Sequence, residues 1–549
     1  MDLQNARKRV VILGGGFAGV YAAQYLEKEL GARDDFEIVL INRENYFVFQ
    51  PMLPEVISGS IGLLDTVSPI RRLLPRTRLH VREIESVDLV ARTVTTSPGF
   101  HQHSHTIAFD HLVVALGNVT DFRGLRGLPE HAMPFKDLAD AVRLRNHVIH
   151  ALEEAAIEDD DPELRRRLLT FVVAGGGFSG VEVVAELNDF VRGVAKTYRG
   201  IDPSEIKVVL LHSGDRILPE MGEKLALYAQ NLLAKRGVDI RLHTRLEAAT
   251  SDEAVLDDGS RIGTKTICST VPSSPHPVVD ALPLPKGRGG RLEVSGELEV
   301  AGASQIWALG DCAQVPAPDG GYAPPTAQHA IRQAKTAAHN IVAEIRGGTR
   351  RVFDFKGLGK MGALGHRSAV AEVFGVMISG FLAWWMWRTI YLMKLPGWGR
   401  RLKVASSWTL DLLLPAELVQ LNLATQAGLG HEHYEPGQTV FMEGDLGDRV
   451  YIILSGSAEV VRGSGEGESV LAQLESGEYF GEMALLNRAP RNATVRCVTP
   501  MDTLSLPKNE FGALAANLPE LRSAFERRMA ERARLNEHAR ARDVEAGAA

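Results

Sequence analysis

The sequence predicts an α/β protein with two nested dinucleotide-binding units of the Rossmann type, then amphipathic membrane-binding helices and an all-β jelly-roll domain with flanking helices. Two nearly identical glycine-rich loops, 14–19 and 175–180, lie about 160 residues apart and predict the two α/β units. A tryptophan-rich segment near residue 376 predicts the helices. Short alternating strands broken by glycine, from about residue 414, predict the all-β domain.

The first glycine loop lies between the apolar run 10–13 and the amphipathic stretch 20–30, which indicate a strand and a helix. Residues 37–41 then indicate a second parallel strand. Glycines at such a turn let the backbone approach a pyrophosphate, and the helix N-terminus stabilises its charge. One such loop is a weak signal, but two predict two dinucleotides, and we expect FAD in the first unit.

The expected FAD site combines the first loop, the end of the second strand, a strand that ends at residue 117 and a returning Gly-Asp turn. Its residues are Gly14, Gly16, Phe17, Ala18, Gly19, Asn42, Arg43, Gly117, Gly310 and Asp311. The fingerprint expects an acid for a ribose hydroxyl where Asn42 stands, and an amide can still accept that hydrogen bond. Asp311 is expected near the flavin ribityl hydroxyls, although Gly-Asp alone is a common turn.

The second loop is expected to bind NADH or NADPH through Gly175, Gly177, Phe178 and Gly180. Glu182 lies either beside the nicotinamide or simply at a position that favours the helix dipole. His212 replaces the acid that usually selects NADH, and together with Arg216 it could accept NADPH, so the choice of cofactor stays open.

The domain order follows from a return to the first unit at residues 305–311. The expected domains are an FAD-binding domain in two parts (1–150 and 291–350), an NAD(P)H-binding domain (151–290), a membrane-binding module (351–412), an all-β ligand-binding domain (413–520) and a charged helical tail (521–549). The acidic stretch 153–163 marks a boundary, or a helix end with a loop. A chain of 549 residues is long enough for three or four domains.

Composition and charge narrow the range of partners and chemistries that we expect for this protein. The net charge of −7 argues against nucleic acid as the main partner. The three cysteines, Cys268, Cys312 and Cys497, lie far apart and never form CxxC, so we expect neither a disulfide framework nor a redox dithiol. Cys312 is expected to be a packing residue, and no metal site is predicted. The short polar N-terminus has no export segment, so the catalytic face is expected in the cytosol.

The tryptophan-rich segment contains four of the six tryptophans between residues 384 and 398. Arg388 and Lys394 would each cost about 2.5–3.5 kcal/mol at a bilayer centre, which disfavours a membrane span. We expect an interfacial helix that contacts the membrane surface through about 376–403, with basic residues at 388, 394, 400, 401 and 403 facing anionic lipid. The alternatives are a buried core helix and a homodimer interface.

Residues 480–495 read Phe-Gly-Glu-Met-Ala-Leu-Leu-Asn-Arg-Ala-Pro-Arg-Asn-Ala-Thr-Val and resemble the phosphate-binding cassette of cyclic nucleotide-binding domains. The resemblance implies that Glu482 accepts from the ribose 2′-hydroxyl and that Arg491 pairs with the cyclic phosphate. Gly481 and Ala484 would offer backbone donors, and Met483 and Asn492 complete the expected site. The choice between cAMP and cGMP stays open, and the alternative is a roll that is empty or holds another ligand.

Five runs in the chain resemble the type II NADH:quinone oxidoreductase family over residues 8 to about 410: 14–19, 45–53, 175–182, 309–312 and 324–330. Residues 359–385 also resemble that family's membrane-binding module. The resemblance implies hydride transfer from NAD(P)H to FAD and then electron transfer to a membrane quinone without proton pumping. It places the protein peripherally on the cytoplasmic face of the inner membrane, with Ala327 and Gln328 beside the flavin and the quinone, and with Glu182 and Gln328 in catalytic roles.

Two departures leave the electron acceptor open. The family's usual second glutamine is Arg332 here, followed by Gln333, and a lysine often found farther along is Leu358. The fused C-terminal domain suggests regulation by cyclic nucleotide. The alternatives are a redox and cyclic nucleotide sensor, and a reductase with a non-quinone acceptor.

Overall fold

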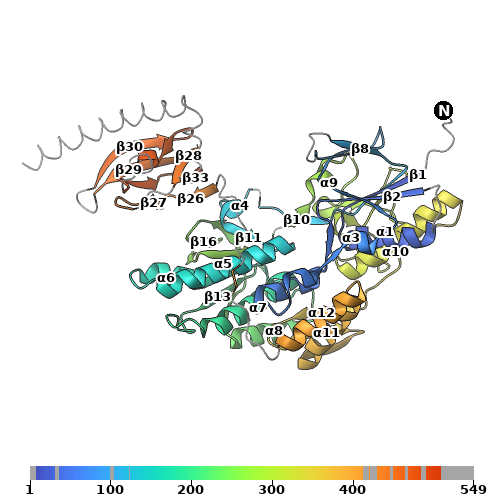
Figure 1. The fold of residues 1–549 in the computed structure, drawn as a ribbon, viewed down its shortest axis with the longest axis horizontal. Coiled ribbons are helices and arrows are strands. Elements are labelled where there is room, and N and C mark those ends of the chain that lie inside the picture. The colour runs from blue at the N-terminus through green and yellow to red at the C-terminus, as the bar shows by residue number, and fades with distance from the viewer. Residues whose placement is uncertain are drawn as a thin grey trace, which may run out of the picture.

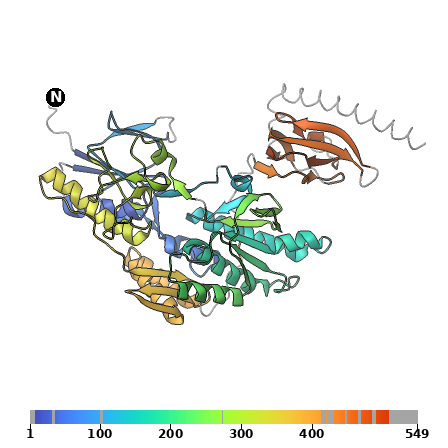
Figure 2. The ribbon, with the colours of Figure 1, turned by 180° about the vertical axis from the view of Figure 1, so that it is seen from behind.

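The structure is a computed structural model, and it describes residues 8–30, 36–98, 104–122, 124–271, 273–411, 419–420, 430–445, 449–463, 468–483 and 490–507. Two α/β units lie side by side, and helices α11 and α12 lie along one edge of the pair (Figures 1 and 2). A β-roll lies at the far end, next to the second unit (Figure 1). The expected tail at 521–549 and the flanking helices of the roll fall outside the described residues.

The first unit is built on a parallel sheet whose order is β21 (Ile306–Ala308), β9 (His111–Val114), β1 (Lys8–Leu13), β2 (Phe36–Asn42) and β5 (Arg78–Val81). Residues 10–13 of the central strand are completely buried, as expected where both faces of a parallel sheet are covered. Helices α1 (Phe17–Leu30) and α10 (Ala327–Arg346) pack against each other. Strand β21 pairs in parallel with β9, so the chain after the second unit adds a strand to the first sheet.

Smaller elements surround this sheet: β3 (Tyr46–Val48) with β4 (Val67–Pro69), β6 (Ile84–Asp88) with β7 (Thr93–Thr96) and β8 (His105–Ala108), β20 (Leu292–Glu293) with β22 (Ala313–Gln314), and helices α2 (Pro54–Ser58), α3 (Ile70–Leu73) and α9 (Pro277–Ala281).

The second unit has its own parallel sheet, in the order β11 (Ala132–Pro134), β18 (Thr266–Ser269), β12 (Thr170–Ala174), β13 (Lys207–Leu211) and β14 (Val238–Arg241). Its helices are α4 (Leu128–His131), α5 (Leu138–Ile157), α6 (Pro162–Leu168), α7 (Phe178–Ala195) and α8 (Glu223–Lys235). A small antiparallel sheet of β15 (Leu246–Ala249), β16 (Glu253–Leu256) and β17 (Arg261–Gly263) lies beside it.

The chain enters the second sheet at β11, earlier than the boundary expected at residue 150, and α5 runs through that position. The acidic stretch 153–163 is the end of α5 and a short loop before α6, where Asp161 caps the next helix. The two units are joined by a two-stranded antiparallel ribbon of β10 (Asn118–Thr120) and β19 (Ser273–Pro275). We call this pair the connecting ribbon.

The module after residue 350 begins with an antiparallel sheet of β23 (Gly359–Ala363), β24 (Ala369–Val373) and β25 (Val376–Gly380), followed by helices α11 (Phe381–Lys394) and α12 (Trp398–Asp411). The expectation of a helix from residue 376 is therefore wrong for its first five residues, which form β25. They pair with β24 in a continuous register, and Gly380, with φ of 75°, ends the strand. None of the helices in the described ranges is both long and apolar enough to cross a membrane.

The C-terminal domain consists of two four-stranded antiparallel sheets. One has the order β26 (Gly430–Tyr434), β33 (Met501–Pro507), β28 (Arg449–Ser455) and β31 (Tyr479–Phe480), and the other has β27 (Thr439–Phe441), β32 (Thr494–Cys497), β29 (Ser457–Arg462) and β30 (Ser469–Glu475). Apolar residues of both sheets form one core between them, so the all-β prediction is confirmed.

Candidate functional site

A cavity of about 560 Å³ opens at the carboxyl ends of the first sheet. Most of the residues expected at the FAD site line it: Gly14, Gly16, Phe17, Ala18, Asn42, Arg43, Gly117, Gly310, Asp311 and Ala327. Gly19 instead lies beneath the loop, where a Cβ atom would collide with the Gly14 carbonyl oxygen. A Cβ atom on Gly16 would meet nothing within 4 Å, so the loop leaves room for a ligand to approach its backbone.

Asn42 has a local partner at the end of β2. Its Oδ1 accepts from the Gly15 N–H at 2.7 Å, and its Nδ2 donates to the Glu44 carbonyl at 2.8 Å. The amide therefore holds the glycine loop in place while its residue lines the cavity. It brings no negative charge to this position.

The turn at Gly310 depends on a residue for which sequence reasoning gave no role. The Gly310 N–H donates to Oε1 of Gln333 at 2.8 Å, and Gln333 is almost completely buried in α10. The contact joins residues 23 positions apart, so only the packing of α10 against the first unit reveals it.

The second glycine loop repeats this arrangement in the second sheet. Gly175 has φ of 115°, and a Cβ atom there would collide with Thr270. The Gly176 N–H donates to Nδ1 of His212 at 3.2 Å. Burial lowers the pKa of His212, so the neutral ring accepts this bond and carries its proton on Nε2. His212 thus takes the position of Asn42 in the first loop, without a negative charge.

Glu182 lies on α7 just after the second loop, and α7 packs against β23. Its Oε1 accepts from the Ala363 N–H at 2.9 Å, and the neighbouring Gly362 packs on the ring of Phe178. The carboxyl keeps some accessible surface, but the packed protein around it raises its pKa to about 8. Glu182 is therefore mostly protonated at pH 7, and the half-buried phenol of Tyr391 lies close enough to interact with it electrostatically.

A second carboxylic acid, Glu186, lies one turn farther along α7 and is more deeply buried than Glu182. Burial raises its pKa, and the nearby charge of Glu55 raises it further. Two acids with raised pKa values therefore lie on one face of this helix, and Glu182 is the one closer to the glycine loop.

Gln328 lies on the first turn of α10. Its Nε2 donates to the Gly359 carbonyl at 3.0 Å, and its Oε1 accepts from the Leu358 N–H at 3.1 Å. Arg332 donates to the Gln328 carbonyl at 3.2 Å and stacks its guanidinium 3.9 Å from the ring of Phe355. Gln328 therefore fixes the chain where β23 begins, and Leu358 contributes only its backbone to this contact.

The three cysteines are all buried. The Sγ of Cys312 lies 3.4–3.5 Å from two backbone carbonyls, and burial raises the pKa of its thiol to about 11. Cys312 has the surroundings of a packing residue and not of a nucleophile.

Large apolar side chains gather on the outside of the module that contains α11 and α12. Those that are exposed are Phe374, Val376, Met377, Phe381, Leu382, Trp385, Met393, Trp398, Leu402 and Leu410. We call these ten residues the apolar face. Exposure of many large apolar side chains in one module is typical of an interaction surface.

Two of the basic residues expected to face lipid point inward. Arg388 pairs with Glu55 at 3.4 Å and lies between the rings of Trp384 and Trp408, 4.3 and 4.7 Å from their centres. Arg400 pairs with Asp65 at 3.4 Å. These pairs hold the module against α2 and the short 3-10 helix Leu63–Thr66, so the expectation that both arginines face lipid is wrong.

The C-terminal domain contains a cavity of about 100 Å³, and Gly481, Glu482, Met483, Arg491 and Asn492 line it. The guanidinium of Arg491 donates to the carbonyls of Gly481 and Arg449 at 2.6 and 2.9 Å and lies 4.0 Å from the ring centre of Phe441. Glu482 is buried. Ala484 lies outside the described residues, whereas the other five expected residues converge on one cavity.

Comparison with known proteins follows the same division of the chain. Residues 8–334 match the pyridine nucleotide-disulphide oxidoreductase family, and residues 431–517 match the cyclic nucleotide-binding domain. The chain is 32% identical to the type II NADH:quinone oxidoreductase NdhA of Mycobacterium tuberculosis over 429 residues, which cover 74% of this chain and 87% of that protein. It is 30% identical to the demethylphylloquinone reductase NdbB of Synechocystis sp. over 412 residues, which cover 74% of this chain and 96% of that protein.

Solved structures agree on the fold. NDH2 from Plasmodium falciparum in complex with NADH superposes with a TM-score of 0.70 at 17% identity, covering 75% of this chain and 100% of that one. The sulfide:quinone oxidoreductase of Aquifex aeolicus superposes with a TM-score of 0.56 at 20% identity, covering 75% of this chain and 96% of that one. The α/β fold prediction is confirmed by these superpositions.

Proposed function

Because the chain belongs to the pyridine nucleotide-disulphide oxidoreductase family and to the type II NADH:quinone oxidoreductase family, we propose that it passes electrons from NAD(P)H through FAD to a membrane quinone, under the control of a cyclic nucleotide. The main support for this proposal is that two glycine loops lie at the carboxyl ends of two separate parallel sheets in one chain. Each loop offers backbone donors and a helix N-terminus to a pyrophosphate. The overall reaction converts NADH, a proton and quinone into NAD⁺ and quinol.

The first cavity fits the proposed FAD. Its volume of about 560 Å³ lies in the range of cofactor pockets, and open space at Gly16 and a positive φ at Gly14 suit a phosphate cradle. Asp311 would bind ribityl hydroxyls, and Asn42 would hold the loop. When bound, the flavin accepts a hydride and releases electrons, which are reactions that no side chain provides.

The second loop would hold the pyrophosphate of NADH or NADPH. His212, neutral and bonded to the Gly176 N–H, would neither repel a 2′-phosphate nor bind a 2′-hydroxyl as an acid does. We therefore expect both nicotinamide cofactors to be used.

Reduction of a quinone also needs protons, and Glu182 is the group that we assign to hold one. Its raised pKa keeps it protonated at pH 7, and it lies between α7 and β23. Gln328 would position the neighbouring chain at residues 358–359 through its two backbone hydrogen bonds. Arg332 and Leu358 would shape the acceptor site of this protein differently from that of its relatives.

The apolar face would hold the protein peripherally on the cytoplasmic side of the inner membrane. Phe381, Trp385 and Trp398 are more than half exposed, as expected of side chains that enter the lipid headgroup region. Lys403 and Arg401 would remain beside anionic lipid, while Arg388 fixes the module to the first unit.

In the C-terminal domain, Arg491 and Glu482 would bind the phosphate and the ribose of cAMP or cGMP. Both side chains lie at one small cavity, and a guanidinium with a fixed orientation suits a phosphate. The fusion of this domain to the reductase is the reason to assign it a regulatory role.

The test is NADH oxidation by the purified protein with FAD and a short-chain quinone, with cAMP or cGMP titrated into the assay. Arg491→Ala is expected to abolish nucleotide binding and its effect on the rate, while turnover without nucleotide stays the same. Arg462→Ala, which changes another arginine of the same domain, is the matched control.

The outcomes separate the parts of the proposal. Rapid oxidation of NADH with transfer to quinone supports the electron path, and its loss despite flavin bleaching by NADH would favour another acceptor or a sensor. Turnover that does not change with either nucleotide would contradict the regulatory part alone.

A further inference from the structure

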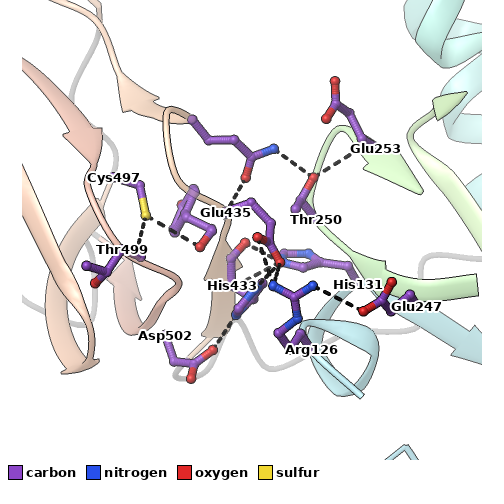
Figure 3. Close-up of polar contacts among 12 residues, drawn as sticks. Arg126, His131, Glu247, Thr250, Glu253, His433, Glu435, Cys497, Thr499 and Asp502 are labelled. Atoms are coloured by element: carbon purple, nitrogen blue, oxygen red, sulfur yellow. Dashed lines mark hydrogen bonds and ion pairs between the residues drawn. The ribbon is translucent and has the colours of Figure 1, made fainter. Parts of the chain in front are cut away.

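The C-terminal domain is docked onto the second unit through three residues of one edge of its roll, His433, Glu435 and Gln438 (Figure 3). Arg126 forms an ion pair with Glu435 at 2.9 Å, and Nε2 of His131 lies 2.9 Å from the His433 N–H. Gln438 donates to the Thr250 hydroxyl at 2.9 Å. We call these contacts the docking interface. They join positions about 190 to 310 residues apart in the chain.

The contacts of the docking interface are specific and partly buried. His433 and Glu435 are almost completely buried, and Nδ1 of His433 lies 2.6 Å from Asp502, which fixes the ring (Figure 3). Burial lowers the pKa of His131, so its neutral ring accepts the N–H of His433. Gly127 packs so closely against His433 that a Cβ atom there would lie 2.8 Å from its ring.

The docked segment of the second unit, residues 124–131, comes shortly after strand β10 of the connecting ribbon in the chain. Its backbone joins the small sheet, because the Ala249 N–H donates to the Arg126 carbonyl at 2.9 Å. Leu128 is buried in a hydrophobic cluster that also contains residues of β12 and β13. A shift of the docked segment would therefore act on both the ribbon and the second sheet.

The connecting ribbon reaches both dinucleotide sites. All three residues of β10 line the FAD cavity, and so does His276, which directly follows β19. At its other end, β19 begins three residues after Thr270, which packs against Gly175 of the second loop and donates to the Ala174 carbonyl. The ribbon thus links the residues around the proposed flavin with those that support the nicotinamide loop.

A short path inside the roll joins the docking interface to the nucleotide cavity. Gln438 directly precedes β27, and Phe441 at the end of that strand lines the cavity and contacts the Arg491 guanidinium. The turn before β27 is held by two backbone bonds to Cys497. A nucleotide phosphate that moves Arg491 would change the packing of Phe441 and, through β27, the position of Gln438.

We propose that the C-terminal domain regulates the enzyme at the connecting ribbon: a cyclic nucleotide in its cavity shifts the docking interface and so changes how the second unit presents the nicotinamide to the flavin. This inference rests on the proposed function and specifies the structural path by which the nucleotide would regulate the enzyme. It makes the affinity for nicotinamide cofactor the regulated quantity, and not attachment to the membrane. The apolar face lies on a different module and shares no residue with the docking interface.

Thermodynamic reciprocity provides a test that does not depend on turnover. If cAMP changes the affinity for NAD⁺, NAD⁺ must change the affinity for cAMP by the same factor. The experiment measures the dissociation constant of a fluorescent cAMP analogue, and of the corresponding cGMP analogue, with and without saturating NAD⁺. We expect a change of about fivefold or more in the wild-type protein, at the lower end of common allosteric couplings.

Arg126→Gln and Gln438→Ala should each retain binding of the analogue but reduce this factor to about one. The matched control is Arg261→Gln, because Arg261 has a similar exposure and pairs at 3.1 Å with Glu253 inside the second unit. The control should keep the wild-type factor. A factor that persists in both interface variants would overturn the inference, as would wild-type protein that binds an analogue without any effect of NAD⁺.

The remaining outcomes separate this inference from the proposed function. If neither analogue binds the wild-type protein, the regulatory part of the proposed function and this inference both fail. If the coupling is present and depends on Arg126 but no quinone is reduced, the electron acceptor is wrong and the inference stands.

Discussion

Replacing Glu182 with glutamine removes one ionisable group with little change in shape. The glutamine side-chain oxygen can still accept the Ala363 N–H that the carboxyl accepts at 2.9 Å. Burial raises the pKa of Glu182 to about 8, so the native group is mostly protonated at pH 7 and mostly ionised at pH 9. Because we assign its proton to the reduction of the acceptor, turnover should decrease as the pH rises through about 8.

The size of the decrease follows from the same pKa. The protonated fraction is about 0.9 at pH 7 and about 0.1 at pH 9, so turnover should fall about tenfold between them where this proton limits the rate. In Glu182→Gln, turnover at pH 7 should be lower than in the wild type, and it should change little between pH 7 and pH 9.

The assay is kcat for NADH oxidation at saturating NADH and quinone analogue, from pH 6.5 to 9.5. Glu186→Gln is the matched control, since Glu186 is a neighbouring buried acid on α7 whose pKa is also raised. The control should keep the decrease through pH 8. An unchanged decrease in Glu182→Gln, or a flat wild-type profile, would refute the assigned role.

Three further predictions concern other parts of the molecule. Arg388→Met should lower the free energy of unfolding by about 3 kcal/mol in urea titrations followed by tryptophan fluorescence, because it leaves the buried Glu55 carboxylate without this cation. Adding Glu55→Gln to the same chain should restore much of the lost stability. An unchanged free energy of unfolding in Arg388→Met would contradict the burial of the pair. His212→Asp should lower kcat/KM for NADPH about tenfold or more and leave that for NADH intact, since a carboxylate there repels a 2′-phosphate; equal effects on both cofactors would argue against this role. Trp398→Ser should weaken binding to anionic vesicles about 30-fold, as expected when about 2 kcal/mol from buried apolar surface is lost. The control Val90→Ser, at a site 98% exposed in the first unit, should have no effect. Equal binding of both variants would place the membrane contact elsewhere.

The parts of the fold that the sequence predicts are those set by local geometry. The backbone has a positive φ at residues 14 and 175, and glycine adopts this conformation without strain. Both loops and their flanking strands and helices therefore follow from the spacing of glycines and apolar residues. The roll follows for the same reason, since its strands alternate and its turns contain glycine.

The parts that the sequence does not predict depend on partners distant along the chain. Arg388 lies in an exposed-looking aromatic segment, yet its charge is neutralised by a carboxylate 333 residues earlier. The strand at 376–380 has the composition of the helix after it, and only pairing with β24 decides its conformation. The bond from Gly310 to Gln333 and the docking of His433 on His131 likewise require the folded chain.

Because all three cysteines are buried, the native protein should react little with thiol reagents. Thiol reagents and mild oxidants need an accessible thiolate, and burial here raises the pKa of each sulfur and shields it from solvent. The protein should therefore keep its activity under mild oxidation that inactivates enzymes with exposed thiols. The same property means that a single cysteine introduced on the roll and another on the second unit would be the only sites labelled, so fluorophores there could follow the separation of the two domains directly.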